Sequence, residues 1–243
     1  MTPSTNGPVR VAAMADLHVG EGAQHPYRDL FAQIAREADV LVLAGDLTNY
    51  GRTREVEILC DDLRTCPIPI LAVLGNHDYE CGQPEEVKRM LREAGARVLD
   101  GEAYEIHGVG FAGAMGGMGG FGRGMMSSFG ESYVKTFVHA CAEEALKLET
   151  SLRMLRTERT FVALHYAPIP DTLVGEPLEI FPFLGSSRLA ETIDRYDHVR
   201  LAVHGHAHRG SYAGRTPRGV PVHNVAAPLL MNEFGRPYVV FEL

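Results

Sequence analysis

The sequence predicts an α/β domain built on a parallel sheet with crossover helices, and three observations support this prediction. Within residues 9–94, short apolar runs alternate with segments of helical spacing in the order β-α-β-α-β-α. Each of these apolar runs ends in a polar cluster, as expected where the carboxyl ends of parallel strands gather ligands. The 243 residues are 45% apolar and 22% charged, a composition and length that fit one globular domain spanning residues 1–243.

The first part of the chain supplies this alternation. Apolar residues at a helical spacing, such as Leu30, Ile34 and Ala38, indicate the first helix. The third helix begins near Pro84 and stops at Gly95, which are typical start and stop signals. The expected strands are residues 9–15, 39–44 and 68–74, and the expected helices are residues 27–38, 53–64 and 84–94.

After residue 95 the pattern changes to short strands, and we expect 97–99, 103–106 and 109–112 to be antiparallel and connected by hairpins. Residues 113–130 contain eight glycines and four methionines, which fits either a flexible surface loop or a lid on the substrate side. The remaining expected elements are helices at 131–156 and 187–196, strands at 160–164 and 199–203, and short strands near 210–213, 220–224 and 238–243.

The composition argues against several classes of protein. The net charge of -8 gives no general attraction to anionic membranes or to long nucleic acids, which argues against both as partners. The N-terminus lacks an apolar leader, and no apolar run approaches the roughly 18 residues of a membrane span. The four cysteines show neither a CxxC pair nor zinc spacing, so we expect free thiols and a cytoplasmic location.

Polar side chains at the expected strand ends form a candidate metal site. Two carboxylates, one carboxamide and four imidazoles suit Mn, Fe, Zn, Ni, Co or Mg ions. Because these donors exceed what one tetrahedral ion can use, we expect two ions that share Asp46. Gly75 is expected to provide the tight or positive-φ turn before its cluster. We expect the side chains of Asp16 and His18 to lie on the same side of an extended segment, and likewise those of His206 and His208. The candidate ligands are Asp16, His18, Asp46, Asn76, His165, His206 and His208.

These clusters, in this order, resemble the motifs of the calcineurin-like metallophosphoesterases. The matching motifs are Asp16-x-His18, Gly45-Asp46, Gly75-Asn76-His77-Asp78, His165 and Gly205-His206-x-His208. The resemblance runs from residue 9 to about residue 225 and implies a four-layer α/β/β/α sandwich. It also implies that Asp16, His18, Asp46 and His208 hold one metal, and that Asp46, Asn76, His165 and His206 hold the other.

The same resemblance implies a reaction. Two cations about 3.5–4 Å apart would bind a shared water, lower its pKa and stabilise in-line attack of the bridging hydroxide on a phosphoester. His77 would lie near the scissile phosphate and protonate the leaving oxygen or stabilise the transition state. The alternative is that His77 is a turn residue capped by Asp78. We keep Asp78 as a further candidate catalytic residue.

The residues after Gly45-Asp46 depart from the pattern of the related Ser/Thr protein phosphatases, in which an aspartate and an arginine follow. Here Asn49 and Tyr50 occupy those places, and the missing arginine counts against a phosphoprotein phosphatase. Asn49 could orient His77 through a neutral hydrogen bond. The run from Gly45 to Gly51 looks more like the bacterial phosphodiesterase branch, which includes enzymes of cyclic nucleotides.

Three further residues are candidates outside the motifs. Arg123, in the glycine-rich loop, could clamp a substrate phosphate. His223 lies at another expected strand end and would either contact the substrate or pack in the structure. His204 precedes the last motif, and we expect it to be either a buried, hydrogen-bonded strand residue or a support for the metal ligands.

Together these features predict a phosphodiesterase that uses two metal ions and acts on a small molecule, with cyclic nucleotides among the candidates. A phosphomonoesterase or a nuclease of the same family is the alternative enzyme. A non-catalytic interaction scaffold on the same fold is the alternative of another class, and the presence of His77 with every candidate ligand counts against it.

Overall fold

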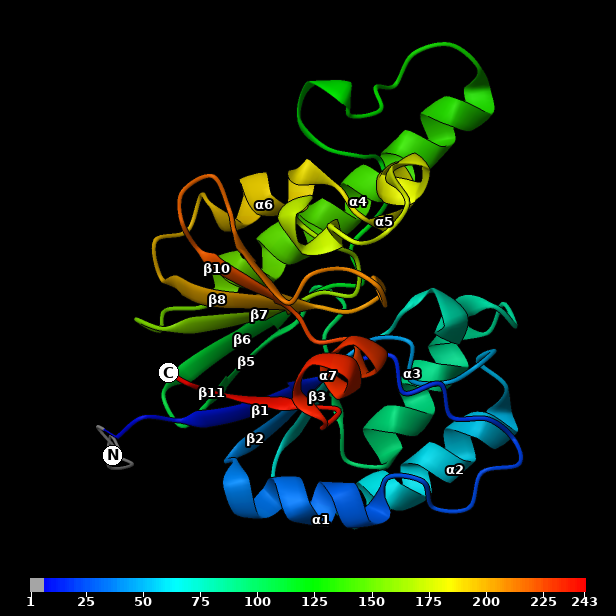
Figure 1. Cartoon of the computed structure of the whole chain (residues 1–243), viewed down its shortest axis with the longest axis vertical. Coiled ribbons are helices and arrows are strands. Elements are labelled where there is room, and N and C mark those ends of the chain that lie inside the picture. The colour runs from blue at the N-terminus through cyan, green and yellow to red at the C-terminus, as the bar shows by residue number, and fades with distance from the viewer. Residues whose placement is uncertain (1–6) are drawn as a thin grey trace.

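Two β-sheets lie face to face at the centre of the computed structural model, which describes residues 7–243 (Figure 1). The first sheet has the order β11-β1-β2-β3-β4, and every neighbouring pair is parallel except β11 and β1. Its strands are β1 (Arg10–Met14), β2 (Val40–Ala44), β3 (Ile70–Val73), β4 (Arg97–Val98) and β11 (Val239–Glu242).

The second sheet has the order β5-β6-β7-β8-β10-β9. Its four central strands are parallel, and the edge strands β5 and β9 pair antiparallel to their neighbours. The strands are β5 (Ala103–Ile106), β6 (Val109–Gly113), β7 (Thr160–Ala163), β8 (Val199–His204), β9 (Ala213–Arg215) and β10 (Pro221–Asn224).

Helices cover the outer face of each sheet (Figure 1). The first sheet is covered by α1 (Arg28–Glu37), α2 (Thr53–Leu63) and α3 (Pro84–Glu93), and the second by α4 (Ser132–Met154) and α6 (Ser187–Ile193). The fold is therefore the predicted four-layer α/β/β/α sandwich. Smaller elements are α5 (Phe181–Leu184), α7 (Ala227–Phe234) and the 3₁₀ turns η1 (Asn76–Tyr79), η2 (Gly122–Gly124), η3 (Asp171–Leu173) and η4 (Leu178–Ile180).

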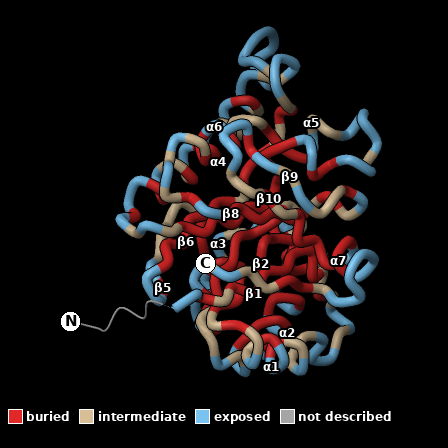
Figure 2. The backbone as a smooth tube through the Cα atoms, turned by 60° about the vertical axis from the view of Figure 1, so that its left-hand side comes forward, coloured by how far each residue is buried: buried red, intermediate tan, exposed pale blue. Residues whose placement is uncertain are grey.

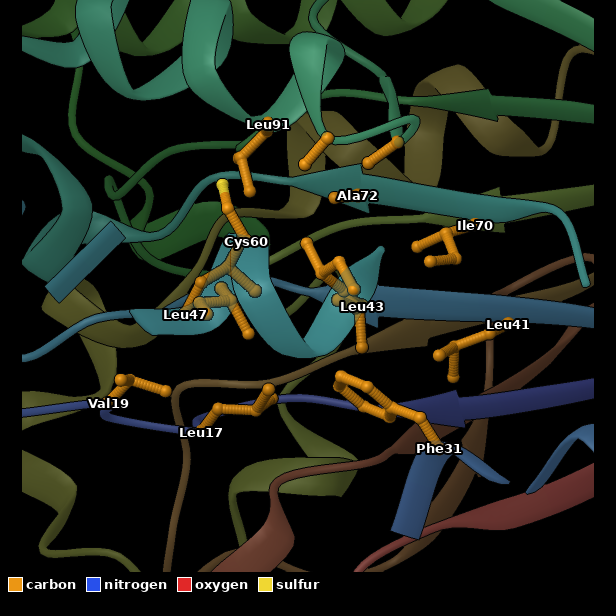
Figure 3. Close-up of a cluster of buried hydrophobic side chains, with 14 of the residues drawn as sticks. Leu17, Val19, Phe31, Leu41, Leu43, Leu47, Cys60, Ile70, Ala72 and Leu91 are labelled. Carbon is orange, nitrogen blue, oxygen red and sulfur yellow. The ribbon is translucent and has the colours of Figure 1, made fainter. Parts of the chain in front are cut away.

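The alternation of side chains along the strands explains this layering. In β2, Leu41 and Leu43 point toward the helices, where Figure 3 shows them packed with Phe31 and Cys60, while Val42 faces the second sheet. Since both faces of a parallel strand are buried, its sequence is continuously apolar. Figure 2 shows the buried backbone running through both sheets, with exposed loops and helix surfaces outside.

Most predicted elements are confirmed within a few residues, but two expectations were wrong and one helix was not predicted. Strand β4 pairs parallel with β3 in the first sheet, so it is not part of the hairpin that β5 and β6 form. Strand β9 begins at Ala213, where an earlier strand near 210–213 was expected. Helix α7 was not predicted, although Pro228 in its first turn and the left-handed Gly235 at its end are ordinary helix signals. None of the helices within residues 7–243 is long and apolar enough to cross a bilayer.

Candidate metal centre

The loops that follow five parallel strands meet at one end of the sandwich. Strands β1, β2 and β3 of the first sheet lead to Asp16, Asp46 and Asn76, and strands β7 and β8 of the second lead to His165 and His206. Backbone hydrogen bonds join neighbouring loops, such as His18 N to Asp46 O at 3.1 Å and Gly205 N to His165 O at 3.2 Å. The two sheets therefore each contribute part of one cluster of donors.

Left-handed backbone conformations place four of the candidate ligands. The φ angles of Asp16, His18, Asp46 and His206 are 59°, 46°, 49° and 69°. Non-glycine residues adopt this region at a cost and are frequent at functional sites. The expectation that the 16/18 and 206/208 pairs lie on extended segments was wrong, because tight left-handed turns, and not strand alternation, direct these side chains.

The glycines of the motifs permit close packing of the loops. A Cβ at Gly45 would overlap the ring of His165, and a Cβ at Gly75 would overlap the Asp46 carboxylate. The φ of Gly75 is −112°, which excludes the positive φ, one of the two geometries expected at this position. Gly75 is required there because another loop approaches it, which is a tertiary constraint.

Asp16, His18 and His208 form the first group of donors, with ligand atoms within 4.8 Å of one another. His208 Nε2 lies 2.9 Å from Asp16 Oδ1, and the His206 N–H donates to the same carboxylate. Burial alone raises the pKa of Asp16, but these hydrogen bonds and the neighbouring imidazoles outweigh it and hold the pKa below its usual value. The carboxylate is therefore ionised and available to a cation.

Asp46, His165 and His206 form the second group, again within 4.8 Å. The Nδ1–H of His165 donates to the Ala44 carbonyl at 3.1 Å, which leaves its Nε2 with a lone pair. That Nε2 faces Asn76 Oδ1 at 3.0 Å and Asp46 Oδ1 at 3.3 Å, which are also acceptors. Lone pairs that converge in this way are satisfied by a cation between them.

Asp46 connects the two groups. One carboxylate oxygen faces His165 and the other lies 3.9 Å from His18 Nε2. This Nε2 is buried and has no hydrogen-bond partner among residues 7–243, and burial lowers the pKa of His18 so that the ring is neutral. Burial likewise lowers the pKa of His206 to about 3. Neutral imidazoles beside ionised carboxylates fit a metal ion, so the residues present match the cofactor that the resemblance implies.

His77 lies beside the donors without being one of the seven. Its ring centroid is 4.6 Å from that of His18, and its backbone N–H donates to Asp46 Oδ1 at 2.9 Å. Its Nδ1–H donates to the backbone carbonyl of Asn49 at 2.7 Å. The neutral hydrogen bond expected from Asn49 is therefore present, but the main chain makes it and the Asn49 side chain does not.

Asp78 holds two loops together through hydrogen bonds to their backbone groups. Its fully buried carboxylate accepts hydrogen bonds from the backbone N–H groups of Leu47, Thr48 and Gly75 and from the Thr48 hydroxyl, at 2.7–3.1 Å. These hydrogen bonds support neither of the two roles expected of Asp78, which were a cap on the His77 ring and a direct part in catalysis. Asp78 instead joins the loop after β2 to the loop after β3.

The other candidates lie outside the donor cluster. Arg123 is exposed in η2. His223 packs between the rings of Tyr212 and Phe241, so its place is in the structural packing between the sheets. His204 is fully buried, with Nδ1 donating to Gly205 O and Nε2 accepting from the Thr172 hydroxyl, both at 2.7 Å. It is the buried, hydrogen-bonded strand residue that the sequence suggested.

The glycine-rich segment divides into two parts. Residues 114–120 are mostly buried, and the Met115 carbonyl accepts from the backbone N–H groups of His165 and Tyr166 at 2.9 and 3.0 Å. Residues 121–131 are mostly exposed. The first part is thus a buried segment packed beside His165. It is not the flexible surface loop that was one of the two expectations.

Two supporting contacts were not predicted. The buried ring of Tyr166 lies 4.6 Å from that of His206 and 5.4 Å from that of His165, and burial raises the pKa of its hydroxyl. The Phe183 carbonyl lies 3.4 Å from His206 Nε2. Tyr166 adjoins a predicted ligand in the sequence, which was an available signal, whereas Phe183 reaches the site only through the fold.

Comparisons with known proteins find related sequences and related folds. The calcineurin-like phosphoesterase family model matches residues 9–210. An uncharacterized metallophosphoesterase of Aquifex aeolicus is 31% identical over 103 residues, covering 41% of this chain and 39% of that protein. A probable glycerophosphodiester phosphodiesterase of Arcobacter nitrofigilis is 22% identical over 175 residues, covering 71% and 58%.

A third relative, a probable cyclic nucleotide phosphodiesterase of Moraxella catarrhalis, is 33% identical over 81 residues, covering 31% of this chain and 29% of that protein. The chain thus spans between 29% and 58% of the length of these relatives. Among solved structures, the phosphopantetheinyl hydrolase of Mycobacterium tuberculosis superposes with a TM-score of 0.69 over 97% of this chain and 96% of that chain, at 16% identity. That similarity concerns the fold alone.

Proposed function

This chain belongs to the calcineurin-like phosphoesterase family, and from this premise we propose that it is a metal-dependent phosphodiesterase that uses two metal ions and acts on small-molecule substrates. The observation that carries the proposal is the position of Asp46. One of its carboxylate oxygens lies 3.3 Å from His165 Nε2 and the other lies 3.9 Å from His18 Nε2, so Asp46 faces candidate ligands on both sides. A carboxylate in that place is suited to bridging two ions.

When bound, the metal ions would supply an activated water for in-line attack and neutralise the charge that develops on the phosphoryl oxygens. Asp16, His18, Asp46 and His208 would hold one ion, and Asp46, Asn76, His165 and His206 the other. The oxygen and imidazole donors suit Mn, Fe, Zn, Ni, Co or Mg. Ala44 and Phe183 keep the ligand rings in orientation through their carbonyls.

His77 is the proposed acid at the leaving oxygen. Its Nδ1–H is fixed on the Asn49 carbonyl, so its Nε2 is the nitrogen free to hold and transfer a proton. The hydrogen bond from its own backbone to Asp46 ties the position of the ring to the bridging carboxylate. The residue can therefore act at the reacting phosphate without occupying a metal site.

A diester substrate is favoured over a phosphoprotein or a simple monoester. Asn49 and Tyr50 stand where the protein phosphatases have an acid and an arginine, so one phosphate-binding cation is missing. Two of the relatives carry phosphodiesterase names, although each match covers only part of those proteins. Cyclic nucleotides remain among the proposed substrates for this reason.

The test is to compare the turnover of bis(p-nitrophenyl) phosphate, p-nitrophenyl phosphate and cyclic AMP by protein loaded with manganese or iron. We expect the diester to be hydrolysed faster than the monoester. Asp46→Ala should abolish turnover and reduce the metal content, measured by elemental analysis, from about two ions per chain. Wild-type turnover in Asp46→Ala would disprove the shared carboxylate, and a wild-type chain that binds no metal would point to the non-catalytic scaffold.

We also propose that the chain is a single domain and works in the cytoplasm. The last strand, β11, pairs with β1 near the start of the chain, which supports one structural unit. Cys60, Cys66, Cys81 and Cys141 are all unpaired, as expected of thiols in a reducing compartment.

A further inference from the structure

One segment beside the metal centre exposes an unusual number of apolar side chains. Single exposed apolar residues are normal on protein surfaces, but a group of them often marks an interaction site. Four such residues lie within ten positions of one another after β7, and we call them the apolar rim. They are Val174, Leu178, Ile180 and Phe183, which are 61%, 75%, 36% and 56% exposed.

Both ends of this segment are attached to the loop that carries His206 and His208. At the first end, the Ser211 hydroxyl donates to Val174 O at 2.9 Å, and Arg209 N donates to the Glu176 carboxylate at 2.7 Å. At the other end, the Phe183 carbonyl lies 3.4 Å from His206 Nε2. The apolar rim therefore borders the candidate metal ligands.

The backbone beneath the rim is held in place by the loop after β7 and by the glycine-rich loop. Ala167 N donates to Leu184 O at 3.0 Å, and Gly120 N donates to Gly185 O at 2.9 Å, which joins the segment to the glycine-rich loop. Leu184 and Phe181 pack into a small core with Leu173. In Figure 1 this segment is yellow, and it ends at α5 close to the green loop. The exposed side chains thus stand on a fixed support.

The charges of the segment restrict what it can receive. Residues 174–187 include two acidic residues, Glu176 and Glu179, and no lysine or arginine. Carboxylates beside an apolar surface repel additional phosphates and anionic lipid headgroups. The occupant that fits is a neutral apolar group attached to the phosphate that the metal centre binds.

From these observations we propose that the substrate is a phosphodiester with an aliphatic substituent, and that the apolar rim binds this substituent while the phosphate lies at the metal centre. This proposal rests on the proposed function and adds the class of substrate to it. The apolar rim then determines specificity, because the metal ligands can recognise only the phosphate. Each methylene group that binding removes completely from water strengthens binding by up to about fourfold. A methylene group that stays half exposed on the surface of the rim strengthens binding by about twofold.

The experiment uses a series of p-nitrophenyl phosphodiesters whose second ester group is methyl, butyl or octyl, each below its micelle concentration. Water forms the new P–O bond, the P–O bond to the nitrophenol breaks, and the products are the alkyl phosphate, p-nitrophenolate and protons. For the metal-loaded wild type we expect kcat/KM to rise about eightfold from methyl to butyl and about a hundredfold from methyl to octyl.

The double variant Leu178→Ser/Phe183→Ser should reduce the octyl-to-methyl ratio of kcat/KM at least tenfold. Leu146→Ser is the matched control, because Leu146 is 58% exposed but lies on α4, outside the rim. This control should keep the wild-type ratio. A ratio is measured within each protein, so a general loss of active enzyme does not alter it.

Each other outcome has a definite meaning. Turnover of the methyl ester with no dependence on chain length in the wild type would overturn the inference and leave the proposed function intact. No turnover of any ester by the metal-loaded protein would overturn the proposed function. If light scattering shows that the double variant changes the oligomeric state and kinetics show an unchanged ratio, the rim is a contact between copies of this chain and the inference is wrong.

Discussion

At the scale of the residue, the side chains of the metal centre depend on partners that are mostly backbone groups. His165 and His77 each donate from Nδ1 to a carbonyl, of Ala44 and Asn49 respectively. In both rings this fixes which nitrogen carries the proton and leaves Nε2 to act on the cluster. The chemistry of an imidazole here is thus set by the path of a neighbouring loop.

His77→Ala should separate metal binding from catalysis. His77 belongs to neither of the two proposed ligand sets, so the variant should retain its metal content, while the rate should fall by roughly 10² to 10⁴. The loss should be larger for phenyl than for p-nitrophenyl diesters, since a poor leaving group needs the proton more. Single-turnover rates on both substrates, with elemental analysis, check this. An equal loss on both substrates would mean that His77 is not the acid.

His204 should make the fold sensitive to acid. Burial lowers its pKa to about 4, whereas an unfolded histidine titrates near 6.5. Between these values the unfolded chain binds a proton that the native chain does not, so the free energy of unfolding falls as the pH falls through this window. The loss amounts to about 3 kcal/mol by pH 4.

The measurement is urea unfolding of the metal-free protein at pH 7 and pH 5, for the wild type and for His204→Gln. The glutamine keeps a donor and an acceptor but cannot titrate, so its stability should fall less over this interval. Other buried histidines titrate equally in both proteins, and the comparison removes them. Parallel losses in the two proteins would show that His204 does not contribute.

At the scale of the element, the loop between β2 and α2 positions His77. Glu55, on the first turn of α2, is buried and accepts from the backbone N–H groups of Tyr50 and Arg52 at 2.8 and 3.2 Å. Asp78 holds the earlier part of the same loop through Leu47 and Thr48. Two carboxylates outside the metal cluster therefore fix the carbonyl to which His77 donates.

Glu55→Ala should reduce kcat while leaving the metal content unchanged. Losing hydrogen bonds to a buried carboxylate costs about 2 kcal/mol of stability, and the Asn49 carbonyl would lose its fixed position. Because the effect acts through His77, the loss should be greater for phenyl than for p-nitrophenyl diesters. Glu55→Gln retains an acceptor and should restore most of the rate.

Glu57→Ala is the control on the same helix, because Glu57 is exposed and, in the part of the chain that the structure describes, pairs only with Arg54. It should leave both stability and kcat near the wild-type values. If Glu55→Ala lowers stability without changing the dependence on the leaving group, Glu55 has a structural role only.

Most elements were predictable because their signals are local. Continuous apolar runs identified β1, β2 and β3, and the polar residue after each run identified the candidate ligands. The partner of a two-residue strand such as β4 has no local signal, since the parallel pairing with β3 arises only when α3 folds back. The left-handed turns at Asp16 and Asp46 and the approach of Phe183 to His206 also come from contacts between loops distant in sequence.

At the scale of the whole molecule, the candidate metal centre joins the two halves of the sandwich. Asp16, Asp46 and Asn76 extend from the first sheet, and His165, His206 and His208 from the second. Ions held by ligands from both sheets would bind the native chain, because these ligands come together only when the chain is folded. Metal binding should therefore stabilise both sheets as one unit.

Removing the metal should lower the unfolding temperature of the entire molecule. An ion present at a hundred times its dissociation constant contributes about 2.7 kcal/mol, which for a chain of this size corresponds to a shift of roughly 5–10 °C. Calorimetry of the protein with excess manganese and then with EDTA measures the shift, and Asp46→Asn should reduce it sharply. One unfolding transition under both conditions agrees with a single domain. Two separate transitions, only one of them sensitive to EDTA, would mean that the sheets unfold independently. In that case the ions would be held by one sheet alone.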